Sequence, residues 1–361
     1  TIPQAPSPLG VTQLNFTLPD NKTPVRLSVK GIAASGSFIK DGQRWKVVMR
    51  GKAGFTYRAD ELPSVGYGGA KQHVKTDAVV PPAAKRSQPT VSHTPPLPQA
   101  LDEPLTADVV VAYSTSLVDI YGSEDAVLAR IADVFSTANQ AYADSGVPLN
   151  MQVVDAIAVD VDPDNSLPSS GVLDMVAGFT GETELFSHVR RQTERVGADF
   201  TVMFRPYAND GYCGIAYLSG SNDSEYVAGN MVSHTSLDCD DIVTAHELGH
   251  NMGLNHSRRQ DGAGYVYPYA LGYGEDGDFA TIMAYPESFD TRTRITKFSS
   301  PNLDCNGSSC GISYEKADQG ADAVHALNLR AQQIADVRQR QNVAGELVVI
   351  NVLGAGQVRY G

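Results

Sequence analysis

The sequence predicts an α+β protein in which a small β-rich unit precedes a larger unit of mixed strands and helices. In residues 1–80, short and partly alternating apolar runs are separated by turn-forming Asp-Asn, Asp-Gly and Gly-Lys pairs. From residue 107 onward, apolar strand-like runs alternate with segments of helical periodicity, as a sheet covered by helices requires. Residues 81–106 are rich in proline and favour an extended linker. We therefore expect units at 1–80 and 107–342, followed by a tail at 343–361.

The first unit is predicted to be a set of short strands. Its apolar runs contain no cluster of metal ligands or nucleophiles, so this unit is not expected to carry catalytic chemistry. Strands are expected at Val11–Leu18, Val25–Val29, Gly36–Ile39, Arg44–Arg50 and Ala53–Arg58.

The second unit opens with Asp108–Tyr113, which has the composition of a buried strand. Apolar residues at helical spacing begin at Ser123 or Glu124 and end at Ser145. In the tail, Leu347–Leu353 is apolar and β-prone, so it is either an added strand or the start of a truncated accessory domain. The other expected elements are strands at Leu149–Ala156, Ala198–Phe204 and Gly214–Leu218, and helices at Leu185–Val196 and Ala317–Gln339.

Size and charge narrow the classes of function. The chain has 361 residues, 42% of them hydrophobic and 19% charged, which provides a sizeable core and suggests about two domains. No stretch approaches the ~20 apolar residues of a membrane helix. The formal charge of −13 argues against nucleic acid or an anionic membrane as partner, and suits either solubility outside the cell or a preference for basic substrate regions. Because the chain begins at Thr1 without a signal-peptide pattern, we expect a leader to have been removed or left out.

The segment from His246 to His256, HELGHNMGLNH, has the pattern of a catalytic zinc site. His246 and His250 share one helix face. Gly253 can end the helix in a left-handed conformation, so that His256 returns as the third ligand. Three protein ligands leave a fourth position open for water, and Glu247 can act on that water as general base. The alternative, a surface helix with two solvated histidines, leaves Gly253 and His256 unexplained.

A second element, Thr281–Pro286 (TIMAYP), is similar to a methionine turn, in which Met283 would form the hydrophobic floor beneath the metal. The zinc motif followed by this turn resembles the metzincin zinc peptidases. From about residue 107 to 340 the chain resembles secreted bacterial metzincins related to the reprolysins and to peptidyl-Asp metalloendopeptidase. The residues that carry this resemblance are DVVVAYS at 108–114, ANQAY at 138–142 with Ser145-Gly146, CGIAY at 213–217 and FSSP at 298–301.

The resemblance implies the metzincin fold, a twisted mixed sheet with helices above a cleft that has zinc on its floor. Gly214–Leu218 would be an edge strand along the rim, where an extended peptide can add through its backbone, and this suits an endopeptidase. The alternative is an ordinary interior strand. The rim residues expected to bind substrate are Gly214, Ile215, Ala216 and Tyr217.

The implied reaction is zinc-dependent peptide hydrolysis in which Glu247 takes a proton from water and passes it to the leaving amine. Tyr285 is the candidate donor to the oxyanion, because astacin- and serralysin-like enzymes have a tyrosine at this place; reprolysins generally lack it, and core packing is the alternative. Ser257 departs from the acidic residue that reprolysins and astacins have there. Competing interpretations are an inactive zincin that acts as a binding module, which the presence of Glu247 disfavours, and an amidase of non-protein substrates, which the rim strand disfavours.

A preference for an acidic residue after the scissile bond follows if the peptidyl-Asp resemblance holds. The pocket for that residue should then carry a cation. Arg292, Arg294 and Lys297 follow the methionine turn, where that wall would be built. The alternative is that all three are solvated surface charges.

The N-terminal unit resembles a propeptide of such enzymes and is expected to act as an intramolecular inhibitor or folding aid. Residues 1–105 contain no cysteine, so no thiolate from this region can block the zinc. A carboxylate or imidazole from His73, Asp77, Asp102 or Glu103 could do so, and steric filling of the cleft is the alternative. Lys85-Arg86 is a candidate processing site.

The cysteine count suggests two disulfides in a chain that looks secreted. Proximity favours Cys305–Cys310 across an Asn-Gly turn and leaves Cys213–Cys239; four thiols or a second metal site are the alternatives. Calcium is possible at Asp160, Asp162 and Asp164, although the glycine and closing glutamate of an EF-hand are missing. His188, His234 and His325 are expected to be structural or exposed.

Overall fold

The computed structural model describes residues 7–18, 23–41, 43–50, 53–62, 76–82, 104–162, 164–180, 184–221, 226–316 and 318–341. Several expectations lie outside these residues and are not addressed by the structure. They are the roles given to His73, Asp102, Glu103 and Lys85-Arg86, most of the linker 81–106, and the strand at Leu347–Leu353.

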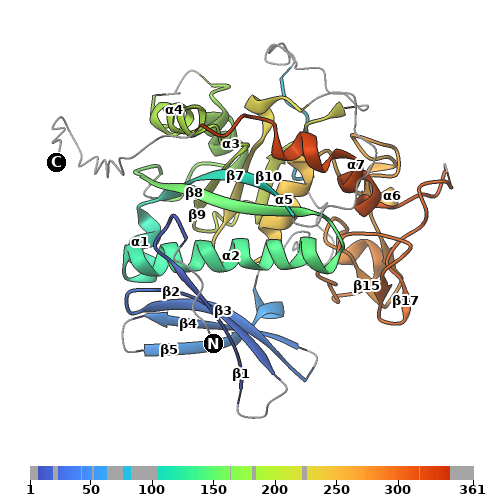
Figure 1. The fold of residues 1–361 in the computed structure, drawn as a ribbon, viewed down its shortest axis with the longest axis horizontal. Coiled ribbons are helices and arrows are strands. Elements are labelled where there is room, and N and C mark those ends of the chain that lie inside the picture. Colours follow the sequence, from blue (N-terminus) through green and yellow to red (C-terminus); the bar gives the residue numbers. More distant parts are fainter. Residues whose placement is uncertain are drawn as a thin grey trace.

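The N-terminal residues form a five-stranded antiparallel sheet in which sequence neighbours pair throughout. The strands are β1 (Thr12–Thr17), β2 (Pro24–Lys30), β3 (Ala33–Lys40), β4 (Gln43–Arg50) and β5 (Ala53–Arg58). The turn between β2 and β3 contains Gly31 at φ 56°, where a side chain would be strained. The expected β-rich unit is therefore present, and Figure 1 shows it packed below the long helix α2 (Glu124–Asp144).

The second sheet has six strands in the order β6-β10-β11-β9-β7-β8. All neighbours are parallel except β10 and β11. Strand β7, which lies between β9 and β8, is buried from Ala107 onward, as its unbroken apolar run requires. The bounds are β6 (Ala78–Val79), β7 (Leu105–Ser114), β8 (Leu149–Val159), β9 (Phe200–Arg205), β10 (Gly214–Tyr217) and β11 (Val232–Ser236).

Helices cover both faces of this sheet, which confirms the α+β class (Figure 1). Alternate residues of β7 point to opposite faces: Val109 and Val111 belong to one apolar cluster, and Val110 and Ala112 to another. The first cluster contains the buried faces of α2, α5 (Ile242–Asn251) and α7 (Ala323–Ala335). The second contains those of α3 (Ser169–Ala177) and α4 (Ser187–Val196).

The boundaries of several elements follow from local chemistry. Helix α2 begins after Ser123, whose hydroxyl accepts a hydrogen bond from the Ala126 amide (3.2 Å). Helix α7 is shorter than the expected Ala317–Gln339, because Asp322 caps it and accepts from the His325 amide (3.1 Å). Among the described residues, no helix combines the length and apolarity that crossing a membrane demands. The smaller elements are α1 (Ser116–Tyr121), α6 (Arg258–Asp261), β12 (Asn255–Ser257), β13 (Leu271–Gly272), β14 (Gly274–Glu275), β15 (Phe279–Ala280), β16 (Asp304–Cys305) and β17 (Ser308–Ser309).

Both expected disulfides are confirmed. Cys305–Cys310 closes the β16–β17 hairpin, and Cys213–Cys239 joins the start of β10 to the loop before α5. The expectation of calcium gains no support. Asp162 accepts hydrogen bonds from Arg205 (2.9 Å) and from the Leu167 amide (2.7 Å), so its carboxylate is engaged in holding its own loop.

Candidate metal centre

Helix α5 brings His246 and His250 onto one buried face. Nδ1 of His246 donates to the carbonyl of Ile282 (2.8 Å), and Nδ1 of His250 donates to that of Leu254 (2.8 Å). A carbonyl can only accept, so in each neutral ring the lone pair is on Nε2. The two Nε2 atoms lie 3.0 Å apart. Helix α5 and the two carbonyl groups thus direct the unprotonated Nε2 atoms of His246 and His250 toward a common point.

The turn after α5 brings in the third imidazole. Gly253 has φ 86°, and a Cβ there would lie 2.8 Å from the Ser219 carbonyl, so both conformation and space require glycine. The chain then reverses and places His256 on β12, where it is buried. Nδ1 of His256 lies 2.7 Å from the carboxylate of Asp261, which also accepts from the His256 backbone amide (2.9 Å).

Asp261 was not singled out from the sequence. It lies at the end of α6, the one-turn helix that follows the third histidine. Backbone carbonyls orient the other two imidazoles, whereas here a carboxylate does so and adds negative charge next to the ring. The signal available in the sequence was an acidic residue a few positions after His256. Many acidic residues on protein surfaces have a histidine that close, so the signal is not specific.

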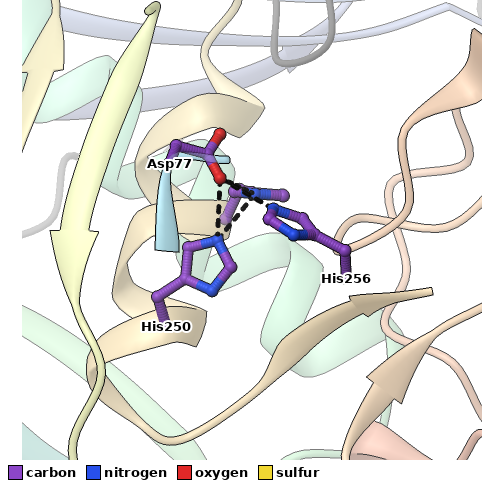
Figure 2. Close-up of side chains that lie close together, drawn as sticks. Asp77, His250 and His256 are labelled. Carbon is purple, nitrogen blue, oxygen red and sulfur yellow. Dashed lines mark hydrogen bonds and ion pairs between the residues drawn. The ribbon is translucent and has the colours of Figure 1, made fainter. Parts of the chain in front are cut away.

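A carboxylate from the N-terminal segment completes the cluster. Oδ1 of Asp77 faces His256 and His250 (Figure 2), at 2.7 Å and 3.2 Å from their Nε2 atoms, and it lies 3.6 Å from Nε2 of His246. The ligand atoms of these four residues all lie within 4.8 Å of one another. Burial alone would raise the pKa of Asp77, but the facing imidazoles hold it well below its usual range. Of the four blocking groups suggested by the sequence, Asp77 is the one within the described residues.

Strand β6 delivers Asp77 to this point. The strand pairs in parallel with β10, the Ala216 amide donating to the Asp77 carbonyl (2.9 Å) and the Leu218 amide to the Val79 carbonyl (2.8 Å). Within residues 104–341 as described, β10 is the outermost strand on this side of the sheet. Strand β10 is thus the edge of the sheet within these residues, and β6 adds to that edge, so that β10 has a strand on each side in the described chain.

The residues at the centre fit a zinc ion. Three imidazole nitrogens and one carboxylate oxygen are the donors that zinc takes in four-coordinate sites. The Nε2 lone pairs of His246 and His250 converge in this buried place, where a cation would compensate them together with the carboxylate. Asp77 occupies the side on which the histidines alone would leave the cluster open.

Glu247 is fully buried, and neither of its carboxylate oxygens has a hydrogen-bond partner among the described residues. Burial, and then the charge of Asp77, raises its pKa well above the usual value. The Glu247 carboxylate packs closely against Gly214 of β10. A Cβ added to Gly214 would lie only 2.2 Å from Oε1 of Glu247. Gly214 thus leaves the space that Glu247 fills. The other rim residues, Ile215, Ala216 and Tyr217, are buried in the sheet.

Met283 and Tyr285 lie beside the cluster. Met283 is buried, and its sulfur packs against Gly249 of α5, at a place where a Cβ on Gly249 would not fit. The ring of Tyr285 has its centroid 4.4 Å from that of His256. Burial raises the pKa of the Tyr285 hydroxyl well above its usual range, as do the charge of Asp77 and a hydrogen bond to it. Tyr285 therefore interacts with the same carboxylate as the histidines.

The three cations suggested for a substrate pocket differ in position. Arg292 is exposed, and Lys297 donates to the Asp304 carbonyl (2.9 Å). Arg294 is half-buried; burial lowers its pKa, while the charges of Asp240, Glu287, Tyr285 and Asp77 act in the opposite direction. The structure thus associates Arg294 electrostatically with the centre, and shows no such association for the other two.

Residues 104–316 match the reprolysin-like metallopeptidase family M12B. A peptidyl-Asp metalloendopeptidase from Pseudomonas aeruginosa is 35% identical over 257 residues, which is 65% of this chain and 41% of that protein, so the match spans less than half of the relative's length. Among solved structures, one titled as a chaperone–substrate complex shares the fold with a TM-score of 0.51 and 19% identity, over 84% of this chain and 44% of that one. Metalloproteinase-II from Bacteroides fragilis gives a TM-score of 0.46 and 11% identity, over 80% of this chain and 84% of that one, a likeness too low to indicate shared function.

Proposed function

This chain belongs to the reprolysin-like metallopeptidases of family M12B, and on that premise we propose that it is a zinc-dependent endopeptidase held latent by its own N-terminal region. The observation that carries the proposal is the convergence of His246, His250 and His256 beside the buried carboxylate of Glu247. Two features extend it. The neighbouring sheet edge accepts an added strand, and Asp77 contacts the donor cluster, which is the set of Nε2 atoms of the three histidines.

In the proposed reaction, His246, His250 and His256 hold the metal. When bound, zinc supplies a Lewis acid that polarises the scissile carbonyl and acidifies water. Glu247 takes a proton from water as the water oxygen bonds to the scissile carbonyl carbon, and it gives that proton to the nitrogen that leaves as the C–N bond breaks. Its contact with Gly214 keeps the carboxylate beside the rim strand. The hydroxyl of Tyr285, which faces the same centre, would donate a hydrogen bond to the developing oxyanion.

Substrates are proposed to bind along β10 as an added strand, read mainly through their backbone. The pairing of β6 with Ala216 and Leu218 supports this, because it demonstrates that the edge can hold an extended segment. The same pairing supports latency. As long as β6 lies on β10, a substrate cannot use those backbone groups, and Asp77 fills the fourth direction of the donor cluster.

The two disulfides support an extracellular location for the enzyme.

Metal removal tests the function directly. Caseinolytic activity of the activated protein is expected to fall to background when a chelator such as phenanthroline is added, because the three histidines cannot position water alone. Activity should return when zinc is restored in excess over the chelator. As a control, a protease that needs no metal ion is assayed on the same casein with the same chelator, to exclude an effect of the chelator on the assay. Proteolysis that persists in protein shown by atomic absorption to lack zinc would contradict the proposal.

Arg294 is proposed to bind an acidic side chain after the scissile bond, in line with the name of the bacterial relative. Arg294→Met should lower kcat/KM for a peptide with Asp after the cut by roughly 10- to 100-fold, since a hydrogen bond to a charged group contributes about 1.5–3 kcal/mol. Cleavage of a peptide with Ala at that place should change little.

Lys297→Met is the matched control for this prediction, because Lys297 is directed at the Asp304 carbonyl. It should leave the ratio of the two kcat/KM values unchanged. An equal loss on both peptides in Arg294→Met would show that Arg294 supports the fold of the site and does not select the substrate.

A further inference from the structure

The N-terminal sheet contacts the second unit at a place separate from the metal centre. Its strands β2 and β3 lie against α2 (Figure 1), and from β4 a side chain reaches the turn that precedes α5. From β4, the side chain of Lys46 crosses this boundary and is completely buried. Its Nζ lies 2.8 Å from Asp133 Oδ2 on α2 and also contacts Asp241 Oδ2. Asp241 directly precedes the helix that carries His246 and His250.

The charges around Lys46 balance only when both units are together. Arg130 on α2 lies 3.3 Å from Asp133 and 2.5 Å from Asp241, and all three side chains are buried. Two carboxylates therefore face two cations, one of which comes from the N-terminal sheet. Burial alone would raise the pKa of Asp241, but the charges of Arg130 and Lys46 hold it below its usual range. Without Lys46, the cation left in direct contact with both buried carboxylates would be Arg130, and such an incompletely compensated buried charge is costly.

Further contacts extend the same boundary. Arg44 pairs with Asp240, and the hydroxyl of Ser35 donates to Asp133 (2.8 Å). Apolar residues also cross it: Leu9, Val11 and Ala33 of the N-terminal unit are buried in the same cluster as residues of α2 and β7. A shared apolar core is a property of permanent interfaces more than of transient ones.

We propose that a docking surface formed by Asp133, Asp240 and Asp241 holds the N-terminal unit noncovalently, so that the unit stays bound and inhibitory after the chain is cut between residues 82 and 104. The proposal rests on the latency proposed above and assigns its two parts to different residues. Lys46 and its neighbours hold the unit in place, and Asp77 blocks the donor cluster. A single cut in the connecting segment then does not activate the enzyme, and activation requires the N-terminal unit to be destroyed or displaced.

The test uses the full chain with a recognition sequence for a specific endopeptidase inserted between residues 86 and 100. Association of the two pieces after cutting is measured in the Glu247→Ala background, where self-digestion is absent, by size-exclusion chromatography over a dilution series. The pieces are expected to co-elute. Lys46→Met should weaken their association by roughly 100-fold or more, because it leaves the facing carboxylates uncompensated in a buried place. The matched control, Lys40→Met on exposed Lys40 of the same sheet, should leave association unchanged.

A double variant separates weak docking from failure to fold. Adding Asp133→Asn to Lys46→Met removes the surplus buried carboxylate and leaves Arg130 paired with Asp241, so part of the lost affinity should return. Thermal unfolding of each uncut chain shows that the variant is folded before it is cut. Immediate separation of the parent pieces, or equal association in Lys46→Met and Lys40→Met, would overturn the proposal.

Activity provides the second measurement, in chains that keep Glu247. The cut parent should remain inactive, the cut Lys46→Met chain should become active on dilution, and cut Asp77→Ala should be active while its pieces still co-elute. A cut parent that is fully active although its pieces stay together would contradict inhibition by the docked unit. If the uncut parent is already active, the proposed latency fails, whereas the association measurement still decides whether the docking surface holds the unit.

Discussion

Asp77→Ala is expected to make the uncut chain proteolytically active. In the parent chain, Asp77 faces all three histidines and interacts with Tyr285, so its loss opens the donor cluster and removes the side-chain contacts that hold β6 there, which lets a substrate displace β6 from β10. Loss of one member of a buried set of charges weakens the contact between β6 and the donor cluster by about 3 kcal/mol or more. If this contact limits access to the site, the rate of hydrolysis rises by roughly 100-fold or more. The measurement is the cleavage of a fluorogenic peptide by chain that mass spectrometry shows to be intact.

Two companion variants show whether the charge of Asp77 is responsible. Asp77→Asn keeps the shape and one oxygen, so an intermediate gain is expected. Glu61→Ala removes an exposed carboxylate from the same N-terminal region and should give no gain. If the intact Asp77→Ala chain is as inactive as the parent and both become active only after proteolysis, the latency results from steric filling of the cleft by β6. The carboxylate of Asp77 would then not be responsible for it.

Glu247→Ala is expected to abolish hydrolysis while zinc remains bound. A positioned general base contributes about 10²- to 10⁴-fold to rate, and the described residues place no other carboxylate against Gly214 at the rim. Glu247 is not among the converging donors, so its loss should leave the zinc content near one equivalent. The experiment is made in the Asp77→Ala background, so that latency does not obscure the result.

The contrasting variant for this prediction is His246→Ala, which should lose activity and zinc together. Glu247→Gln keeps the shape of the side chain and should be as inactive as Glu247→Ala, because it cannot accept the proton. Unchanged peptide hydrolysis in Glu247→Ala would exclude its role as base, and loss of zinc would mean that Glu247 supports the metal site instead.

The local part of the candidate site was predictable, because its spacing is set by one helix and one turn. His246 and His250 are four residues apart on α5, and Gly253 has the positive φ that the motif requires. The apolar runs likewise predicted the five N-terminal strands and β7, whose burial follows from composition. Such features depend on near neighbours in the sequence, and sequence patterns report near neighbours well.

The parts that were missed depend on tertiary contacts. Strand β11 is fully buried, yet four of its five residues are polar, so it has no apolar pattern; His234 within it accepts from Arg205 (2.9 Å). Lys46 lies within the predicted strand Arg44–Arg50, and nothing nearby in the sequence indicates the carboxylates that it meets. Asp77 was one of four candidates, and only the pairing of β6 with β10 distinguished it.

The Cys213–Cys239 disulfide has a mechanical consequence. Cys213 adjoins Gly214 at the rim, and Cys239 adjoins Asp240 of the docking surface. The two are separated by 26 residues in the sequence, but the bridge shortens the covalent path between them to a single cross-link. Any force that pulls the N-terminal unit away from Asp240 and Asp241 is therefore transmitted to the strand along which substrates are proposed to lie. The rim strand and the loop that carries Asp240 and Asp241 therefore stay covalently coupled for as long as the bridge is intact.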